Sequence, residues 1–301
     1  MTLDPEHLAY PHRRYGMDHD RYDWDPPSRR ARATLASGAK ALAVLVVPLE
    51  FFPLNPPAGP FKHPGAMATP YPDLRHYTCR DYGARVGVFR ILRALAAAGL
   101  NATFAVNALV AQRYPPLLAA IAAAGHEIAA HGVSTAHLHH AGLSEAEEAA
   151  LVATTRAALP SARVWLSPAR NQSFLTPDLA REAGFDICLD WEFDERPTPM
   201  RTRAGPLWCV PLHNELSDFT LLSTRSQTED AWAEQVLEAA AYGVARAEAE
   251  GALSLGITLT PYVTGQAFRQ QALSRILHGL AAQPGLEAAT VSAAAAAFAT
   301  G

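Results

Sequence analysis

Polar side chains that could transfer protons or bind a metal follow the apolar runs of this chain. They comprise carboxylates, imidazoles, hydroxyls, an amide and a guanidinium: Glu50, His131, Ser167, Arg170, Asp190, His213, Asn214, Glu215 and Thr260. If the apolar runs are parallel strands, residues just past their carboxyl ends point into one shared cavity. Carboxylates and imidazoles that meet there are the groups needed for general acid–base catalysis or for metal binding.

Three of these residues also have a structural interpretation. Glu50 lies within the apolar segment PLEFFPL, so we expect a buried carboxylate, either in a site or as part of a loop. His131 closes an apolar run, which favours a site role over that of a structural histidine. Asp190 could take part in catalysis, or it could bond backbone N–H groups of the neighbouring strand.

The elements that must position these residues are predicted by hydrophobic periodicity and by capping signals. The run ALAVLVV at 41–47 is rich in valine, as is typical of a strand buried on both faces. Further strands are predicted at 101–106, 126–131, 207–212 and 252–261 and in the segments ARVWLSP and FDICLDW. Helices are predicted at about 145–158, 228–250 and 267–282. The first of these helices opens with a capping box formed by Ser144 and Glu147.

Alternation of strands and helices predicts an α/β fold with a parallel sheet. Seven or eight such units favour closure into a barrel, although an open doubly wound sheet is the alternative. No G-x-G-x-x-G follows the first strand, which argues against the usual dinucleotide site. Residues 1–35 lack periodicity and contain Pro26-Pro27, so we expect an irregular N-terminal arm, with residues 36–301 forming a single barrel domain. The proline-rich stretch 48–77 predicts a long loop that is functional or wraps over the surface.

Composition narrows the classes of partner. A net charge of −4 over 301 residues, without a basic stripe, gives no reason to expect nucleic acid. The three cysteines lie far apart, so we expect no disulfide framework and no thiolate metal site, as in a cytoplasmic protein. No apolar run is long enough to predict a membrane span or a signal peptide. Aromatic residues between Tyr10 and Trp24 could pack against a second copy, which leaves a homo-oligomer open.

Six ordered segments resemble the polysaccharide deacetylase (NodB-homology) superfamily. They are RDYGARVGVFRIL, GHEIAAHG, WLSPARNQSFLTPDLAREAGFD, LDWEFDERP, VPLHNELSD and LTPYVTGQAFR. More closely, they resemble its branch of metal-independent allantoinases and cyclic-imide hydrolases, from about Tyr22 to the carboxyl terminus. The resemblance implies a distorted (β/α)7 barrel. It also implies hydrolysis of a non-peptide carbon–nitrogen bond in an N-acetyl, ureido or cyclic amide substrate.

The chain departs from the metal-dependent members of that superfamily. Their first strand is followed by an Asp-Asp pair that supplies a base and a metal ligand, whereas Glu50 is the only acid at that place here. An H-x-x-x-H motif supplies two further ligands in those enzymes. His131 matches its first histidine, but Thr135 stands at the second. Ser167 and Thr260 likewise replace the expected arginine and histidine.

Three hypotheses follow. The first is an amidohydrolase for a small-molecule amide, without a cofactor, in which Glu50 or His131 is the general base and Asp190 or Glu215 orients it. Its substrate would be held by Ser167, Arg170, Trp191, His213 and Asn214. The second keeps a divalent metal such as zinc, bound by Glu50, His131 and one of His137, His139 or His140, with His139 as the preferred third ligand. The third is a catalytically impaired barrel that binds a ligand or partner, as the substitutions at 135, 167 and 260 suggest.

Overall fold

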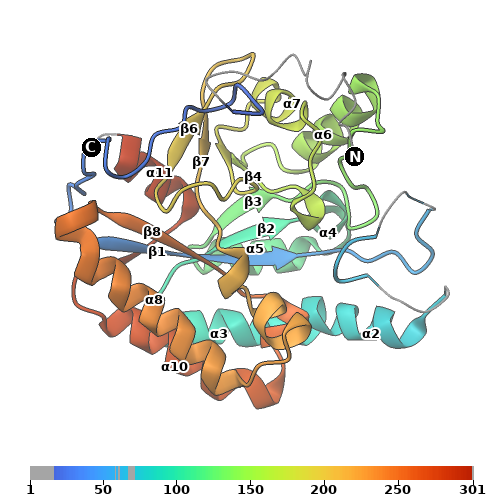
Figure 1. Ribbon diagram of the computed structural model, residues 1–301. Coiled ribbons are helices and arrows are strands. Elements are labelled where there is room, and N and C mark those ends of the chain that lie inside the picture. The colour runs from blue at the N-terminus through green and yellow to red at the C-terminus, as the bar shows by residue number, and fades with distance from the viewer. Residues whose placement is uncertain (1–16, 58, 60–61, 67–71, 300–301) are drawn as a thin grey trace, which may run out of the picture.

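A curled sheet flanked by helices forms the framework of the molecule (Figure 1). The computed structural model describes residues 17–57, 59, 62–66 and 72–299. The strands are β1 (Ala41–Leu49), β2 (Thr103–Val106), β3 (Glu127–Ala130), β4 (Val164–Trp165), β5 (Ile187–Cys188), β6 (Thr198–Met200), β7 (Leu207–Cys209), β8 (Leu253–Thr258) and β9 (Leu286–Ala289). Their order is β6-β7-β5-β4-β3-β2-β1-β8, and β9 pairs with β1. The pairings between these strands are parallel except that of β6 with β7.

Helices follow most of the strands. They are α2 (Leu74–Tyr82), α3 (Val88–Ala98), α4 (Ala108–Arg113), α5 (Pro115–Ala123), α6 (Glu145–Ala158), α7 (Thr176–Glu182), α8 (Glu229–Glu250), α9 (Pro261–Thr264), α10 (Gln270–Ala282) and α11 (Val291–Ala299). The capping box of Ser144 and Glu147 is present at the start of α6. None of the helices in the described part of the chain is long and apolar enough to cross a membrane.

Both faces of β1 are buried, as its valine-rich sequence predicts. Side chains on one face, including Leu45 and Leu49, pack in the larger core with helices such as α3 and α10. The alternate side chains, including Val44 and Val46, join a second core with residues of the other strands and of α11. The strand is therefore held by packing on both sides, which fixes the position of the residue that follows it.

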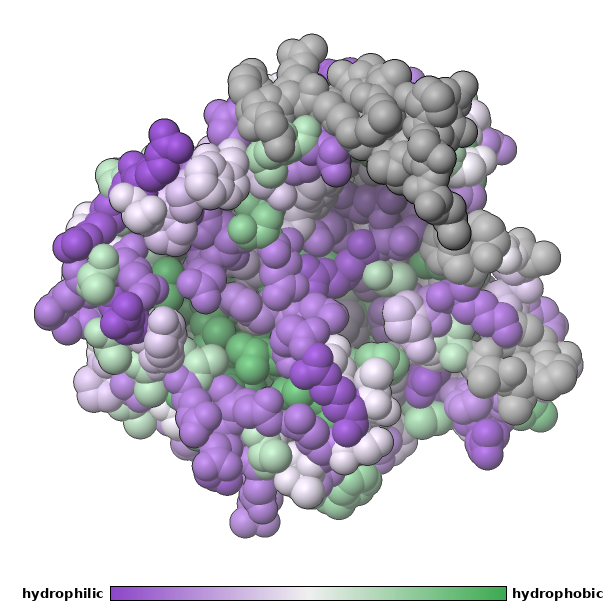
Figure 2. Space-filling model, in the orientation of Figure 1, coloured by the Kyte–Doolittle hydropathy of each residue, from purple (hydrophilic) through white to green (hydrophobic). Residues whose placement is uncertain are grey.

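The barrel is open between β7 and β8, which share no ladder among the described residues. The segment after β7 crosses β8 instead, and the N–H of His213 donates to the carbonyl of Gly256 over 3.1 Å. A Cβ atom at Gly256 would lie 2.1 Å from the carbonyl oxygen of Pro211, so this crossing requires glycine. Figure 2 shows apolar side chains gathered in a hollow at this open side, where Leu253 and Leu255 of β8 face α8.

The predicted α/β fold of deacetylase-barrel type is confirmed, in the form of a curled sheet that does not close by hydrogen bonds. The part of the predicted arm at 17–35 has no regular element. It lies on the barrel through a buried ion pair between Arg21 and Asp178, with a nitrogen to oxygen distance of 2.6 Å. Residues 1–16, including Tyr10 of the proposed oligomer contact, lie outside the described residues.

Replacing Gly256 with alanine tests the crossing that brings β8 against the segment after β7. The new methyl group must displace backbone atoms of Pro211 and Leu212, so we expect the free energy of unfolding to fall by about 1–3 kcal/mol. Gly243→Ala is the matched control. Gly243 lies in α8, and a Cβ atom there would make only ordinary contacts, at 3.5 Å or more. That change should be neutral or stabilise by roughly 0.5–1 kcal/mol. Denaturant unfolding of both variants measures the difference, and equal stabilities would contradict the predicted clash.

Candidate active site

A cavity of about 440 Å³ lies at the carboxyl ends of the central strands. Leu49 of β1, Val106 of β2, Ala130 of β3 and Trp165 of β4 are successive register partners across the sheet. The residues that follow them therefore form a row across the end of the sheet: Glu50, Asn107, His131 and Leu166. Of the predicted site residues, the cavity is lined by Glu50, His131, Arg170, Asn214 and Glu215.

Glu50 carries a buried carboxylate at one wall of this cavity. Its side chain is 7% exposed, and its Oε1 atom lies 2.7 Å from His63 Nε2 and 3.5 Å from His131 Nε2. Burial by itself would raise the pKa of Glu50, but the neighbouring His63 and His131 outweigh burial and lower the pKa. The carboxylate is therefore ionised at neutral pH.

The backbone sets the tautomer of both imidazoles. His63 Nδ1 accepts the N–H of Gly65 over 3.0 Å, so its ring proton is on Nε2 and is donated to Glu50. His131 Nδ1 lies 3.0 Å from the carbonyl oxygen of Leu166, which can only accept, so Nδ1 carries the proton. In neutral His131 the Nε2 lone pair consequently faces Glu50 and the cavity. A neutral imidazole in this orientation can accept a proton from water.

Sequence reasoning missed two residues of this cavity. His63 lies in the long proline-rich stretch at 48–77, which was expected to be functional or to cover the surface, but Glu50 was its one residue considered for the site. Tyr262 is the second residue of α9, which follows Thr260, and it also lines the cavity. Burial, together with the negative charge of Glu50, raises the pKa of Tyr262 well above its usual value, so its phenol remains a proton donor. The available sequence signal for His63 was its place in a loop directly before Pro64-Gly65.

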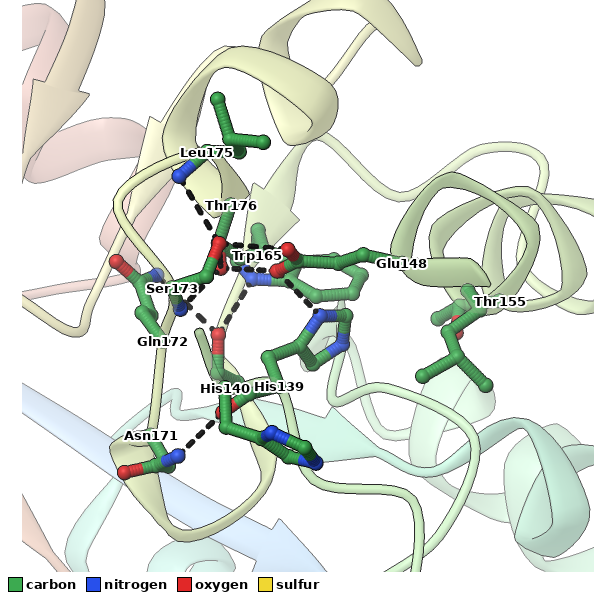
Figure 3. A network of polar contacts seen from close by, with 12 residues as sticks. His139, His140, Glu148, Thr155, Trp165, Asn171, Gln172, Ser173, Leu175 and Thr176 are labelled. Carbon is green, nitrogen blue, oxygen red and sulfur yellow. Dashed lines mark hydrogen bonds and ion pairs between the residues drawn. The ribbon is translucent and has the colours of Figure 1, made fainter. Parts of the chain in front are cut away.

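The metal set that was considered from the sequence is not assembled. His139 is buried in a separate network, where its Nδ1 lies 3.0 Å from Glu148 Oε1 (Figure 3). The same carboxylate accepts hydrogen bonds from the hydroxyls of Ser173 and Thr176, so it is fully engaged inside the protein. His137 Nδ1 pairs instead with the hydroxyl of Ser134 over 2.7 Å. Within the described ranges, no three histidine, cysteine, aspartate or glutamate side chains are grouped to hold a metal.

Of the two imidazoles beside Glu50, that of His63 does not fit the metal-dependent pattern either. A histidine that binds a metal through one ring nitrogen normally donates the proton of the other. His63 cannot do so, because the N–H of Gly65 already donates to its Nδ1. Thr135, at the position of the second ligand in the related enzymes, donates its hydroxyl to the carbonyl of Phe51 over 2.9 Å. The donor set therefore does not fit the metal centre that the superfamily implies.

Four predicted site residues lie outside the cavity lining. Asp190 accepts the N–H of Ser167 over 2.9 Å and the side-chain N–H of Gln172 over 2.6 Å, which corresponds to its structural interpretation. Burial raises the pKa of Asp190 despite these hydrogen bonds. The Ser167 hydroxyl accepts the indole N–H of Trp165, and the indole N–H of Trp191 donates to Gln172. His213 Nδ1 accepts the N–H of Gly256 where the barrel is bridged.

Arg170 and Glu215 occupy different parts of the cavity. Arg170 has a positive φ of 55°, and its guanidinium donates to the carbonyl of Leu212 over 2.7 Å, joining the segments after β4 and β7. It also lies 3.3 Å from the carboxylate of Glu192. Glu215 is at the mouth, where its side chain is 62% exposed and pairs with Arg225. That position separates it from the buried pair of Glu50 and His131.

Comparisons with known proteins give the wider context. Residues 72–186 match the family model described as polysaccharide deacetylase. A solved allantoinase, Puue, is 22% identical with a TM-score of 0.78, and the likeness covers 97% of this chain and 98% of the allantoinase. A protein from Pseudomonas aeruginosa PAO1, described as a probable polysaccharide deacetylase, is 19% identical with a TM-score of 0.78. That likeness covers 90% of this chain and 95% of the other. No curated protein matches the chain closely enough to count as a relative.

At these identities, likeness to the solved structures establishes a shared fold. Together with the family match, it confirms the resemblance that the six sequence segments indicated. Residues 72–186 therefore resemble the polysaccharide deacetylase family, and the chain shares its fold with a solved allantoinase.

Proposed function

We propose that the chain hydrolyses a non-peptide carbon–nitrogen bond in a small-molecule amide. The observation that carries this proposal is the buried, ionised Glu50 beside the Nε2 atom of His131 at the wall of the cavity. The family match and the fold shared with an allantoinase support the class of bond. The cavity volume of about 440 Å³ lies in the range of small-molecule sites.

The geometry can hold the attacking water between two acceptors. His131 Nε2 and Glu50 Oε1 are 3.5 Å apart, so one water can lie within hydrogen-bond distance of both. Such a water would donate one proton to each acceptor and turn a lone pair towards the substrate carbon. Because its pKa is strongly lowered, Glu50 is a weak base, which leaves His131 as the general base.

In the proposed reaction, the water oxygen bonds to the amide carbon while its proton passes to His131 Nε2. Ionised Glu50 stabilises the imidazolium that forms, and the other ring proton stays on Nδ1, hydrogen-bonded to the Leu166 carbonyl. The phenol of Tyr262 donates to the oxyanion of the tetrahedral intermediate. Collapse of the intermediate breaks the carbon–nitrogen bond, and His131 returns its proton to the leaving nitrogen.

The remaining cavity residues suit a compact substrate with a polar edge. Pro48, Leu166, Leu212 and Phe219 give the cavity apolar walls. Asn214 and Arg170 present polar groups among them, which can orient an amide or a ureido group. Small apolar cavities with a few fixed polar groups favour single small molecules.

Replacing His131 with alanine should lower kcat by roughly 10²–10⁴-fold, because the proton acceptor is lost. Cyclic ureides, cyclic imides and N-acetyl sugars form the substrate panel, and acid or acetate release is the measurement. His278→Ala is the matched control, since that histidine is exposed on α10 and bonds only its own helix. Unchanged turnover in the His131 variant would remove it as the base. Tight binding of a panel compound without turnover would favour the non-catalytic barrel.

Replacing Tyr262 with phenylalanine removes the proposed oxyanion donor and keeps the ring. We expect kcat to fall by roughly 10²–10³-fold with a much smaller change in KM, because this bond strengthens only in the transition state. Steady-state kinetics on the same substrates separates the two constants. A rise in KM at constant kcat would instead assign Tyr262 to substrate binding.

Replacing Glu50 with glutamine should flatten the dependence of stability on pH. Because the folded chain holds the pKa of Glu50 below its ordinary value of 4.5, this group contributes stability above that pH. The contribution is lost as the pH falls from 4.5 towards the lowered pKa. Denaturant unfolding between pH 7 and pH 3 should therefore show a steeper acid loss for the natural chain than for the variant. Parallel curves would contradict a lowered pKa.

A further inference from the structure

We infer that Arg80 is a positioning residue that acts on Glu50 through Gly65 and His63. This inference rests on the proposed function, because it concerns the same carboxylate. Arg80 belongs to α2 and does not line the large cavity. Its hydrogen-bonded link to the site is one peptide unit in the loop after β1, and its guanidinium also lies against the ring of Tyr262.

The guanidinium of Arg80 clamps the carbonyl of Gly65 with two hydrogen bonds. Its Nε atom donates over 2.9 Å and its Nη2 atom over 2.6 Å. The guanidinium carbon also lies 4.1 Å from the ring centre of Tyr262 and 5.5 Å from that of Phe52. Two donors and two flanking rings fix the orientation of this side chain and hence of the carbonyl that it holds.

The same residue, Gly65, sets the tautomer of His63. Its N–H donates to His63 Nδ1, which leaves the ring proton on Nε2, 2.7 Å from Glu50. If Gly65 turned away, Nδ1 could carry the proton and Nε2 would face Glu50 with a lone pair. The carboxylate would then lose a hydrogen bond that lowers its pKa.

Gly65 is also packed against the proposed oxyanion donor. A Cβ atom at this position would lie 2.6 Å from the hydroxyl oxygen of Tyr262 and 3.2 Å from His63 Nδ1. The close approach means that displacement of this peptide also disturbs the phenol. Arg80 thus holds a residue that approaches both His63 and Tyr262.

The first test needs no substrate. Nitrogen-15 NMR of the histidine rings reports which nitrogen carries the proton. In the natural chain, His63 should show the proton on Nε2. In Arg80→Gln, we expect the proton of His63 on Nδ1 or an averaged signal. Arg80→Lys keeps the charge and one donor group, so its His63 signals should lie between those of the natural chain and of Arg80→Gln. An unchanged His63 tautomer in Arg80→Gln would overturn the inference.

The second test is kinetic and separates a positioning role from a general loss of structure. Arg80→Gln should lower kcat by roughly 10–100-fold, in line with the cost of small misplacements in active sites, and Arg80→Lys should recover part of it. In a His63→Ala background, Arg80→Gln should lower kcat by a smaller factor than in the natural chain, because the route through His63 is absent and only the contact with Tyr262 remains. Equal losses in both backgrounds would contradict the inference.

Arg85→Gln is the matched control, because that side chain is 74% exposed and pairs only with Asp81. It should leave the His63 tautomer and kcat unchanged.

The two proposals fail in different ways. Unchanged turnover in His131→Ala would overturn the proposed function, whereas the His63 tautomer and its coupling to Arg80 decide the role of Arg80.

Discussion

A buried negative charge on Glu50 is the constraint on which the rest of the site depends. Removing an ionised carboxylate from water costs several kcal/mol unless donors surround it. His63 supplies one donor at 2.7 Å, and it must be brought from a loop that turns back over the end of the sheet. The charge therefore explains why the loop after β1 folds inward. In the proposed mechanism, the same charge stabilises the ring of His131 once that ring has accepted the proton of the water.

The sheet gives this charge a fixed position. Strand β1 is buried along its whole length, so Glu50 emerges at a defined point between β2 and β8. Asn107, next in the row, accepts the N–H of Phe51 and donates to the carbonyl of His131. One amide thus ties the segment after β1 to the end of β3. Because these bonds involve backbone groups of adjacent parallel strands, the separation of Glu50 and His131 follows from strand register.

Local sequence patterns were sufficient to predict the framework and the positions of Glu50 and His131, but not all of the residues around them. Valine-rich runs and the Ser144 cap gave the strands and helices, and positions after strands gave Glu50 and His131. His63 was out of reach because its place depends on contacts across the fold, chiefly the clamp of Arg80 on Gly65. His139, the preferred third ligand in the metal hypothesis, was singled out for its sequence position alone. It follows His131 closely along the chain, but Glu148 on α6 holds it in the core.

The buried contact of Glu148 with His139 and that of Glu50 with His131 have different fates, and access to the cavity distinguishes them. The Nε2 atom of His139 is enclosed with no hydrogen-bond partner, whereas that of His131 faces the cavity and Glu50. Two residues at positions where the related enzymes have reactive or ligating side chains make structural hydrogen bonds here. The hydroxyl of Thr135 holds Phe51, next to Glu50, and that of Thr260 donates to buried Asp218 over 2.8 Å. The bond of Thr135 fixes the loop that carries Glu50, and that of Thr260 fixes the segment after β8. In the proposed mechanism, Glu50 and His131 carry the chemistry.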